Sequence, residues 1–221
     1  LSASLPDEPV NVLREDAVNE NLLFAGTDGG VYVSLNRGNT WMLWNKGMPN
    51  VPVHDLVIQP KAKELVVGTH GRSIFIAGID LIEKLNDSLM QKPLYSFAGS
   101  RYKLPSSLGK ENKYPYYETT APEIRFAYYA KASGPVTVSL YDSNRKLLAE
   151  LHDTAKAGLN HVMYNYRVMP PSAALNSKSK NKPAPIAPAA DGNFYISKGN
   201  YTLQFVQGDA KTEAAVEFFE K

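Results

Sequence analysis

The fold of the first half is decided by the stretch Leu22-Leu23-Phe24-Ala25-Gly26-Thr27-Asp28-Gly29-Gly30-Val31-Tyr32-Val33-Ser34. Its pattern returns downstream as Leu65-Val66-Val67-Gly68-Thr69-His70-Gly71-Arg72-Ser73-Ile74-Phe75-Ile76. Both stretches consist of an apolar run, the tetrapeptide Gly-Thr-x-Gly and a second apolar run. Gly26 and Gly68 lie 42 residues apart, and one four-stranded propeller blade has a period of about 40–45 residues.

Each copy of the pattern predicts a set of short antiparallel strands. The first copy predicts strands over residues 9–15, 22–27, 31–34 and 40–44, and the second over 53–58, 64–69 and 73–77. A hairpin is expected at residues 28–30, because glycine adopts positive φ without steric cost. We therefore expect the last one to two blades of a β-propeller. The alternative is a small antiparallel meander with an accidental echo.

Two blades on their own would leave an apolar face in water, because each blade packs against its neighbours and a propeller closes with at least four. The missing blades are expected before Leu1 in a longer parent protein, or from another chain. The N-terminus has no initiator Met and no basic region followed by an apolar one, so we expect an interior fragment and no signal peptide here.

A short helix over about residues 81–90 is expected to end the propeller part. Asp80 and Glu83 have the spacing of a capping box, and apolar residues recur at helical spacing as far as Met90, before Pro93. The predicted domains are residues 1–92, a connector over 93–121, and a second module over 122–221.

The second module alternates apolar and polar residues in short runs. Strands are predicted over residues 123–130, 136–142, 147–151, 162–166, 194–196, 200–207 and 212–219. This number of short strands in about 100 residues favours an immunoglobulin-like β-sandwich. Residues at about 170–190 are rich in Pro, Ala, Ser and Lys, which indicates a flexible insertion. The predicted fold class is all-β, with the short helix between the two parts.

Composition excludes several classes of function. The chain of 221 residues is 43% hydrophobic and 21% charged, as in soluble globular proteins. A net charge of +2 from dispersed basic residues argues against nucleic-acid binding. The absence of cysteine excludes disulfides, thiolate metal sites and a cysteine nucleophile. No apolar run approaches the ~20 residues that span a bilayer, so the chain is not expected to be membrane-spanning.

Residues Ser34-Leu35-Asn36-Arg37-Gly38-Asn39-Thr40-Trp41 resemble the Asp-box of bacterial neuraminidase repeats, with Asn36 in the Asp position. The surrounding repeat, over roughly residues 9–92, resembles the propeller of sortilin-like, BNR-repeat proteins of Bacteroides-group bacteria. The run from Gly68 to Ile74 resembles the last-blade motif of that family. The resemblance implies an extracytoplasmic bacterial protein, which is periplasmic, on the cell surface or secreted.

The segment from Pro122 to Glu217 resembles the Ig-like module of the flagellar hook-capping protein. The matching runs are residues 136–142, 157–161 and 198–203. The resemblance implies a spacer or attachment role, without known chemistry.

The Asp-box is expected to be structural. A short polar side chain caps the backbone donors of the turn, a glycine takes an unusual φ, and the tryptophan packs between strands. The residues with these roles are Ser34, Asn36, Gly38, Thr40 and Trp41.

Ligand-binding candidates lie in the loops. Arg72 beside His70 is the best single candidate at the loop end of a blade, against the alternative of a solvated turn arginine. Three tyrosines of the connector could form a carbohydrate-stacking platform or pack the connector onto a domain: Tyr114, Tyr116 and Tyr117.

No metal site or cofactor is expected. His54 and Asp55 are adjacent and could ligate a metal, but the sequence offers no third ligand.

No catalytic residue is expected either. Sialidase chemistry needs an arginine cluster, a Tyr-Glu nucleophile pair and an acid. The arginines of the repeats, Arg14, Arg37 and Arg72, occupy different positions within the blades. The nearby acids Glu15, Asp28 and Asp55 have no evident partner in the sequence.

The leading hypothesis is a non-catalytic C-terminal fragment that acts in recognition or scaffolding of a protein or glycan. The rival is the C-terminal portion of a sialidase-like glycoside hydrolase with a propeller fold. A third hypothesis is a purely structural piece that completes the sheet of another chain. In each case the expected partner is the rest of the propeller.

Overall fold

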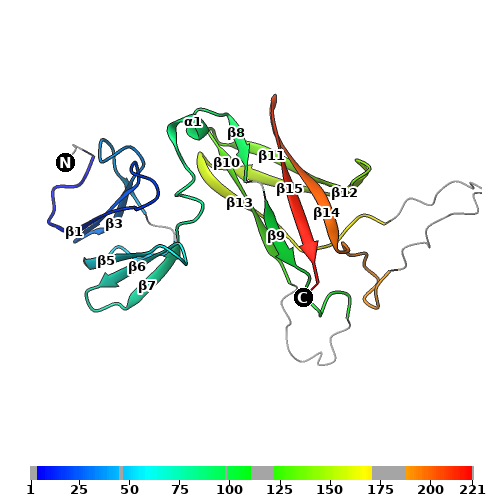
Figure 1. The fold of residues 1–221 in the computed structure, drawn as a ribbon, viewed down its shortest axis with the longest axis horizontal. Helices are drawn as coiled ribbons and strands as arrows, with labels where there is room; N and C mark the ends of the chain where they lie inside the picture. The colour runs from blue at the N-terminus through cyan, green and yellow to red at the C-terminus, as the bar shows by residue number, and fades with distance from the viewer. Residues whose placement is uncertain (1–3, 45–46, 98, 111–121, 171–187, 221) are drawn as a thin grey trace, which may run out of the picture. The chain divides into compact units, whose positions relative to one another are not determined.

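The computed structural model describes residues 4–44, 47–97, 99–110, 122–170 and 188–220. It divides the chain into unit 1, Leu1–Met90, and unit 2, Gln91–Lys221. In these ranges the secondary structure consists of β-strands in four sheets and one four-residue α-helix (Figure 1). The expectation of an all-β chain with one short helix is therefore confirmed.

Unit 1 holds two antiparallel sheets whose strands follow chain order. Sheet A consists of β1 (Val10–Glu15), β2 (Leu23–Thr27), β3 (Gly30–Ser34) and β4 (Met42–Leu43). Sheet B consists of β5 (Val53–Gln59), β6 (Glu64–Thr69) and β7 (Ile74–Gly78). Sheet B has no strand that corresponds to β4, so among the described residues one edge of β7 is unpaired.

Sheets A and B have the same internal geometry. The first strand of each carries a register shift that leaves one residue unpaired, Asn11 in β1 and His54 in β5. Beyond the shift, Phe24 pairs with Val33 in sheet A as Val66 pairs with Ile76 in sheet B. The repeat of the sequence is thus also a repeat of register, and the positions of β1–β3 have counterparts in β5–β7.

One face of sheet A packs on sheet B. Their shared core contains the side chains Val12, Leu22, Phe24, Val31, Val33, Val53, Leu56, Leu65, Val67 and Ile79. Because strand residues alternate between faces, the opposite face of sheet B consists of Val57, Val66, Ile74 and Ile76, which we call the sheet B flank. Ile74 and Ile76 are 68% and 64% exposed, whereas their counterparts in sheet A, Val31 and Val33, are 3% and 5% exposed.

The predicted helix over residues 81–90 is shorter than expected. Helix α1 spans only Asp87–Met90, and the Asn86 side chain accepts a hydrogen bond from the Leu89 amide at its start. The preceding residues form turns, because the Glu83 carboxylate lies 2.8 Å from Lys63 Nζ instead of returning to the backbone of Asp80 as a capping box requires.

Unit 2 holds a three-stranded and a five-stranded sheet. Sheet C has the order β13 (Gly158–Tyr164), β10 (Ile124–Ala130), β8 (Leu94–Ser96). Sheet D has the order β12 (Leu147–Ala155), β11 (Gly134–Tyr141), β14 (Gly199–Gln207), β15 (Ala210–Phe219), β9 (Ser100–Lys103). All neighbours are antiparallel except β15 and β9, which are parallel.

Both sheets of unit 2 contribute side chains to one aromatic-rich core. Phe126 of β10 stacks on Tyr164 of β13 with ring centroids 5.3 Å apart, and Tyr128 packs on Phe205 of β14. The Tyr128 hydroxyl donates to Asp153 at 2.6 Å. Burial, with this hydrogen bond, raises the pKa of Tyr128 well above its usual value.

Two expectations for the second half need correction. The segment predicted as a connector over 93–121 contains β8 and β9, which pair into sheets C and D; residues 111–121 lie outside the described residues. In place of the strand predicted over 194–196, the structure has an isolated bridge between Tyr195 and Arg167. The residues on either side of this bridge belong to no strand. Of the predicted insertion, residues 171–187 lie outside the described ranges.

Candidate functional site

The candidate site lies at the end of unit 1 where the first strand of each sheet, β1 and β5, bulges. Asn11 and His54 are the bulge residues, and each lies opposite the Gly-Thr pair of the next strand. Directly after those Gly-Thr pairs come Asp28 and His70. The fold therefore brings two pairs of polar side chains to this end, one from each repeat.

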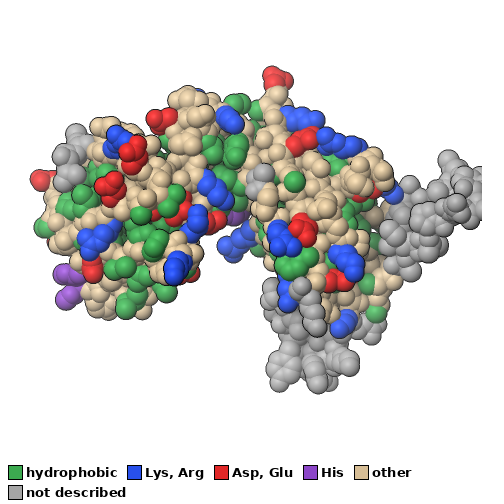
Figure 2. Space-filling model, in the orientation of Figure 1, with side chains coloured by type: hydrophobic (Ala, Val, Ile, Leu, Met, Phe, Trp, Pro, Cys, Tyr) green, Lys and Arg blue, Asp and Glu red, His purple; other side chains and the backbone are tan. Residues whose placement is uncertain are grey.

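The side chains of each pair touch. Asn11 Nδ2 donates to Asp28 Oδ1 at 2.9 Å. At the equivalent positions, the rings of His54 and His70 have centroids 5.2 Å apart and planes inclined at 47°. All four side chains are exposed, and Figure 2 shows histidine gathered on the surface of unit 1.

Two side chains of β1 connect the repeats at this end. Asn11 Nδ2 also donates to the Val53 carbonyl at 3.2 Å. Arg14 Nε donates to the Leu56 carbonyl at 2.7 Å, and Arg14 Nη2 lies 2.9 Å from Asp55 Oδ1. These bonds hold β5 beside β1, so the position of His54 is fixed relative to the first repeat.

Hydrogen bonds to two backbone carbonyls hold the loop after β6 in place. The Thr69 hydroxyl donates to the Ser73 carbonyl at 2.6 Å, and the His70 amide donates to the Pro52 carbonyl at 2.9 Å. Gly71 has a φ of +73° and Ser73 a φ of +117°, in the left-handed region that a non-glycine residue seldom adopts. His70 and Arg72 are both exposed in this loop.

The acids that the sequence offered for catalysis do not form a catalytic pair. Asp28 accepts from Asn11, and Asp55 accepts from Arg14 and from the Leu56 amide. Glu15 is exposed in the last position of β1. The two aspartates are therefore engaged with separate donors.

The Asp-box residues form one hydrogen-bonded turn. The Gly38 amide donates to Ser34 Oγ at 2.8 Å, and the Thr40 amide donates to Asn36 Oδ1 at 2.9 Å. The Trp41 indole donates to the Gly38 carbonyl at 3.1 Å. Gly38 has a φ of +82° and Trp41 is buried. The polar side chains therefore bond within the turn.

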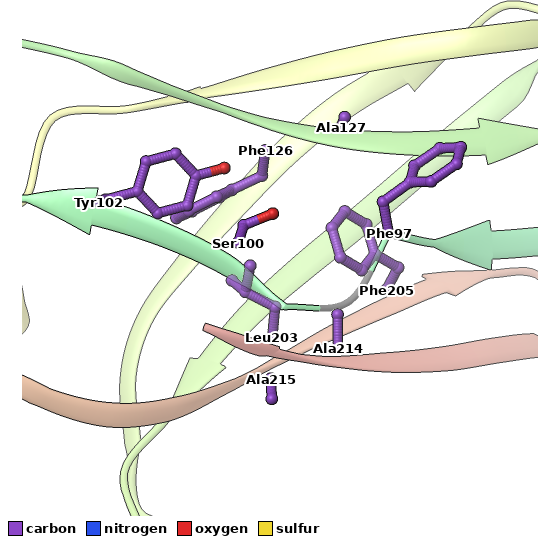
Figure 3. A pocket seen from close by; sticks show the side chains of 9 residues that line it. All are labelled: Phe97, Ser100, Tyr102, Phe126, Ala127, Leu203, Phe205, Ala214 and Ala215. Carbon is purple, nitrogen blue, oxygen red and sulfur yellow. The ribbon is translucent and has the colours of Figure 1, made fainter. Parts of the chain in front are cut away.

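Unit 2 has a cavity inside its core and a depression at its surface. The cavity lies between Phe97, Tyr102, Phe126 and Phe205 (Figure 3). Its volume of about 10 Å³ is room for at most one water molecule. An open depression of about 460 Å³ lies beside the 131–135 turn and Gln207. Neither has the convergent polar side chains of an enclosed ligand site.

Within the described ranges, no group of three or more His, Cys, Asp or Glu side chains could hold a metal ion. Tyr114, Tyr116 and Tyr117, the predicted sugar-stacking platform, lie outside those ranges. The sequence indicated His70 and Arg72, but not the contact of His70 with His54. An alignment of Val10 with Val53 and of Gly26 with Gly68, which skips one residue between these positions, would have found it, because His54 and His70 then fall on Asn11 and Asp28.

Comparisons with known proteins found no matching family model and no matching curated protein. Among solved structures, the chain is similar to the extracellular domain of a hybrid two-component system from B. thetaiotaomicron, with 12% identity and a TM-score of 0.28 over 98% of this chain. Trypsin-activated alpha-2-macroglobulin from Escherichia coli matches over 92% of this chain, with 13% identity and a TM-score of 0.28. The chain spans 26% and 13% of these structures. TM-scores this low define neither fold nor function. In the part of the chain described, no helix has the length and apolar character to cross a membrane.

Proposed function

We propose that the chain is a non-catalytic recognition or scaffolding module of an extracytoplasmic bacterial protein. In this proposal unit 1 is the C-terminal part of a sortilin-like, BNR-repeat β-propeller, and unit 2 is an immunoglobulin-like sandwich that serves as spacer or attachment domain. The observation that carries the proposal is the repeat in unit 1, which extends from sequence to strand register, bulge position and side-chain contacts.

The sheet B flank supports the propeller. In sheet A, the face that contains Val31 and Val33 is covered by sheet B. The same face of sheet B contains Ile74 and Ile76, which are largely exposed. A soluble protein rarely exposes several large apolar side chains in one patch unless a partner covers it. A further sheet, placed on sheet B as sheet B is placed on sheet A, would cover this flank.

The number of strands supports the same conclusion. Sheet A is completed by β4, which pairs with β3 through Tyr32–Leu43 and Val33–Met42. In sheet B the corresponding edge belongs to β7, whose chain continues into Ile79 instead of turning back. An open edge is a template for another strand. The rest of the propeller, from the parent protein or another chain, is therefore the first partner of unit 1.

Ligand recognition is assigned to the end of unit 1 that carries the 70–73 loop. His70 and Arg72 are exposed there, and hydrogen bonds hold the backbone of their loop in place. The ring of His54 packs against His70, and the Asn11–Asp28 pair lies at the same end. A loop on a rigid scaffold is where binding residues commonly lie. The Asp-box residues, in contrast, have a structural role, because their polar atoms are engaged inside the turn.

Unit 2 fits a spacer. Its two sheets share one core, and its internal cavity holds at most one water molecule. The side chains of the strands alternate between buried and exposed positions, as in β11 and β15. Such a domain can act as a spacer and offer a surface for attachment, without catalysing a reaction.

Calorimetric titration of the full chain with panels of peptides and glycans tests this proposal. The expected result is saturable binding of one class, weakened by Arg72→Ala and unchanged by Lys61→Ala, which removes an exposed cation from the β5–β6 turn. Turnover of a glycoside by the chain would contradict the proposal and favour the rival hydrolase. Binding that survives Arg72→Ala at full affinity would remove the site from this loop.

A further inference from the structure

Two histidines from different strands lie against each other on the surface of unit 1. His54 is the bulge residue of β5, and His70 follows the last residue of β6. Their ring centroids are 5.2 Å apart, and both side chains are exposed. The site uses no buried group, so a dissolved ion can reach it directly.

The first repeat shows what these two positions do to a pair of side chains. At the equivalent positions, Asn11 and Asp28 are close enough for a direct hydrogen bond of 2.9 Å. The backbone of the repeat therefore places the two side chains where they can share one atom. In the first repeat this atom is the amide hydrogen that Asn11 donates to Asp28. Two neutral imidazoles each offer a nitrogen lone pair, and a metal ion can accept both.

The separation of the rings fits one shared metal ion. Histidine nitrogen binds zinc at about 2.0–2.1 Å, and the preferred arrangement is tetrahedral. Two imidazoles on one such ion have ring centres about 5 Å apart by this geometry. The ring centroids of His54 and His70 are 5.2 Å apart, which matches the spacing expected for two imidazoles on one ion.

The backbone around the pair is held on both sides. The His70 amide donates to the carbonyl of Pro52, two residues before His54. Next to His54, the Asp55 carboxylate is fixed by Arg14 and by the Leu56 amide. Such preorganisation keeps the entropy lost on binding small.

We propose that His54 and His70 form an exposed two-histidine site for a divalent transition-metal ion that prefers imidazole nitrogen, such as Cu²⁺, Ni²⁺ or Zn²⁺. With two protein ligands, the other coordination positions remain open to water or to a donor atom of a bound molecule. The metal site stands on the geometry of these two rings and does not depend on the propeller assignment.

Isothermal titration of the untagged chain with Cu²⁺, and separately with Zn²⁺, tests the site. The expected result is one ion per chain, with the ring signals of His54 and His70 shifting together in NMR spectra during the Zn²⁺ titration. Loss of a residue that merely supports a metal ligand costs about 10–100-fold in affinity. Each of His54→Ala and His70→Ala should therefore weaken binding at least about tenfold.

Two controls separate the site from general histidine binding and from misfolding. His152→Ala removes an exposed histidine of unit 2 and should leave the affinity unchanged. The double variant His54→Asn with His70→Asp reproduces the Asn11–Asp28 pair of the first repeat; it should keep the fold and lose Cu²⁺ affinity. No saturable binding by the chain, or binding of undiminished affinity in both alanine variants, would overturn the proposal.

Discussion

Thr27 and Thr69 make the same hydrogen bond in two successive sheets. The Thr27 hydroxyl donates to the Gly30 carbonyl at 3.1 Å, and the Thr69 hydroxyl donates to the Ser73 carbonyl at 2.6 Å. Gly30 and Ser73 both have positive φ, +141° and +117°. Thr27 is buried, whereas Thr69 is half-buried. The two repeats thus share their turn chemistry and differ in what covers them.

Substitutions at the equivalent positions Val33 and Ile76 should have opposite outcomes. Val33→Lys places a charge in the core between the sheets, which costs several kcal/mol when the charge is unpaired, and should unfold unit 1. Ile76→Lys, on the sheet B flank, should change the free energy of unfolding by less than about 0.5 kcal/mol. Thermal denaturation followed by circular dichroism compares them. Equal destabilisation by both variants would mean that the flank is already covered.

Two buried tyrosines of unit 2 should respond differently to loss of the hydroxyl. Tyr128→Phe removes a hydrogen bond to Asp153 and should cost about 1–2 kcal/mol. The buried Tyr164 hydroxyl has no hydrogen-bond partner among the described residues, so Tyr164→Phe should be neutral or slightly stabilising. Urea unfolding of the three chains measures the difference. A larger loss for Tyr164→Phe than for Tyr128→Phe would contradict this assignment of the core.

The stability of unit 2 should depend on Glu213 in acid. Hydrogen bonds from Arg145, and then from Gln204, lower the pKa of the Glu213 carboxyl from 4.5 to about 2. A carboxyl with a depressed folded-state pKa stabilises the fold above its unfolded-state value, and this stabilisation is lost as the pH falls towards the folded-state value. The contribution should therefore be complete above about pH 4.5 and disappear towards about pH 2.

Glu213→Gln tests this pH dependence. The variant should be less stable than the parent at neutral pH, and the difference should shrink as the pH falls from about 4.5 to about 2. Urea midpoints across this range provide the measurement, with Glu220→Gln at a largely exposed ion pair as control. A difference that stays constant with pH would show that the carboxylate is not stabilised by Arg145.

The strands of unit 1 could be predicted because their signals are local. The strand expected over 64–69 has the bounds of β6, and the turns that flank it contain Gly or Pro. β9 could not be predicted in this way, because its four residues pair in parallel with β15, more than 100 residues later in the chain. The helix was predicted to begin too early, because Glu83, the residue expected to close the capping box, pairs with Lys63 of the β5–β6 turn.

The candidate site was predictable only in part. His70 and Arg72 follow a Gly-Thr pair in a loop, which the sequence shows directly. The contact of His70 with His54 depends on the bulge in β5. A one-residue bulge changes the direction in which the side chain at that position points. The repeat contained the necessary signal, since Asn11 bulges in the same way in β1.

The most direct test of the repeat and its open flank compares Gly26 with its counterpart Gly68. A Cβ at Gly26 would meet Val53 Cγ1 at 2.6 Å and Val12 Cγ1 at 2.7 Å, whereas a Cβ at Gly68 would meet nothing closer than 3.5 Å. Urea unfolding should show that Gly26→Ala costs about 1–3 kcal/mol, and that Gly68→Ala is neutral or stabilises by up to about 1 kcal/mol. Equal losses at the two positions would contradict the account, because they would mean that sheet B is covered as sheet A is.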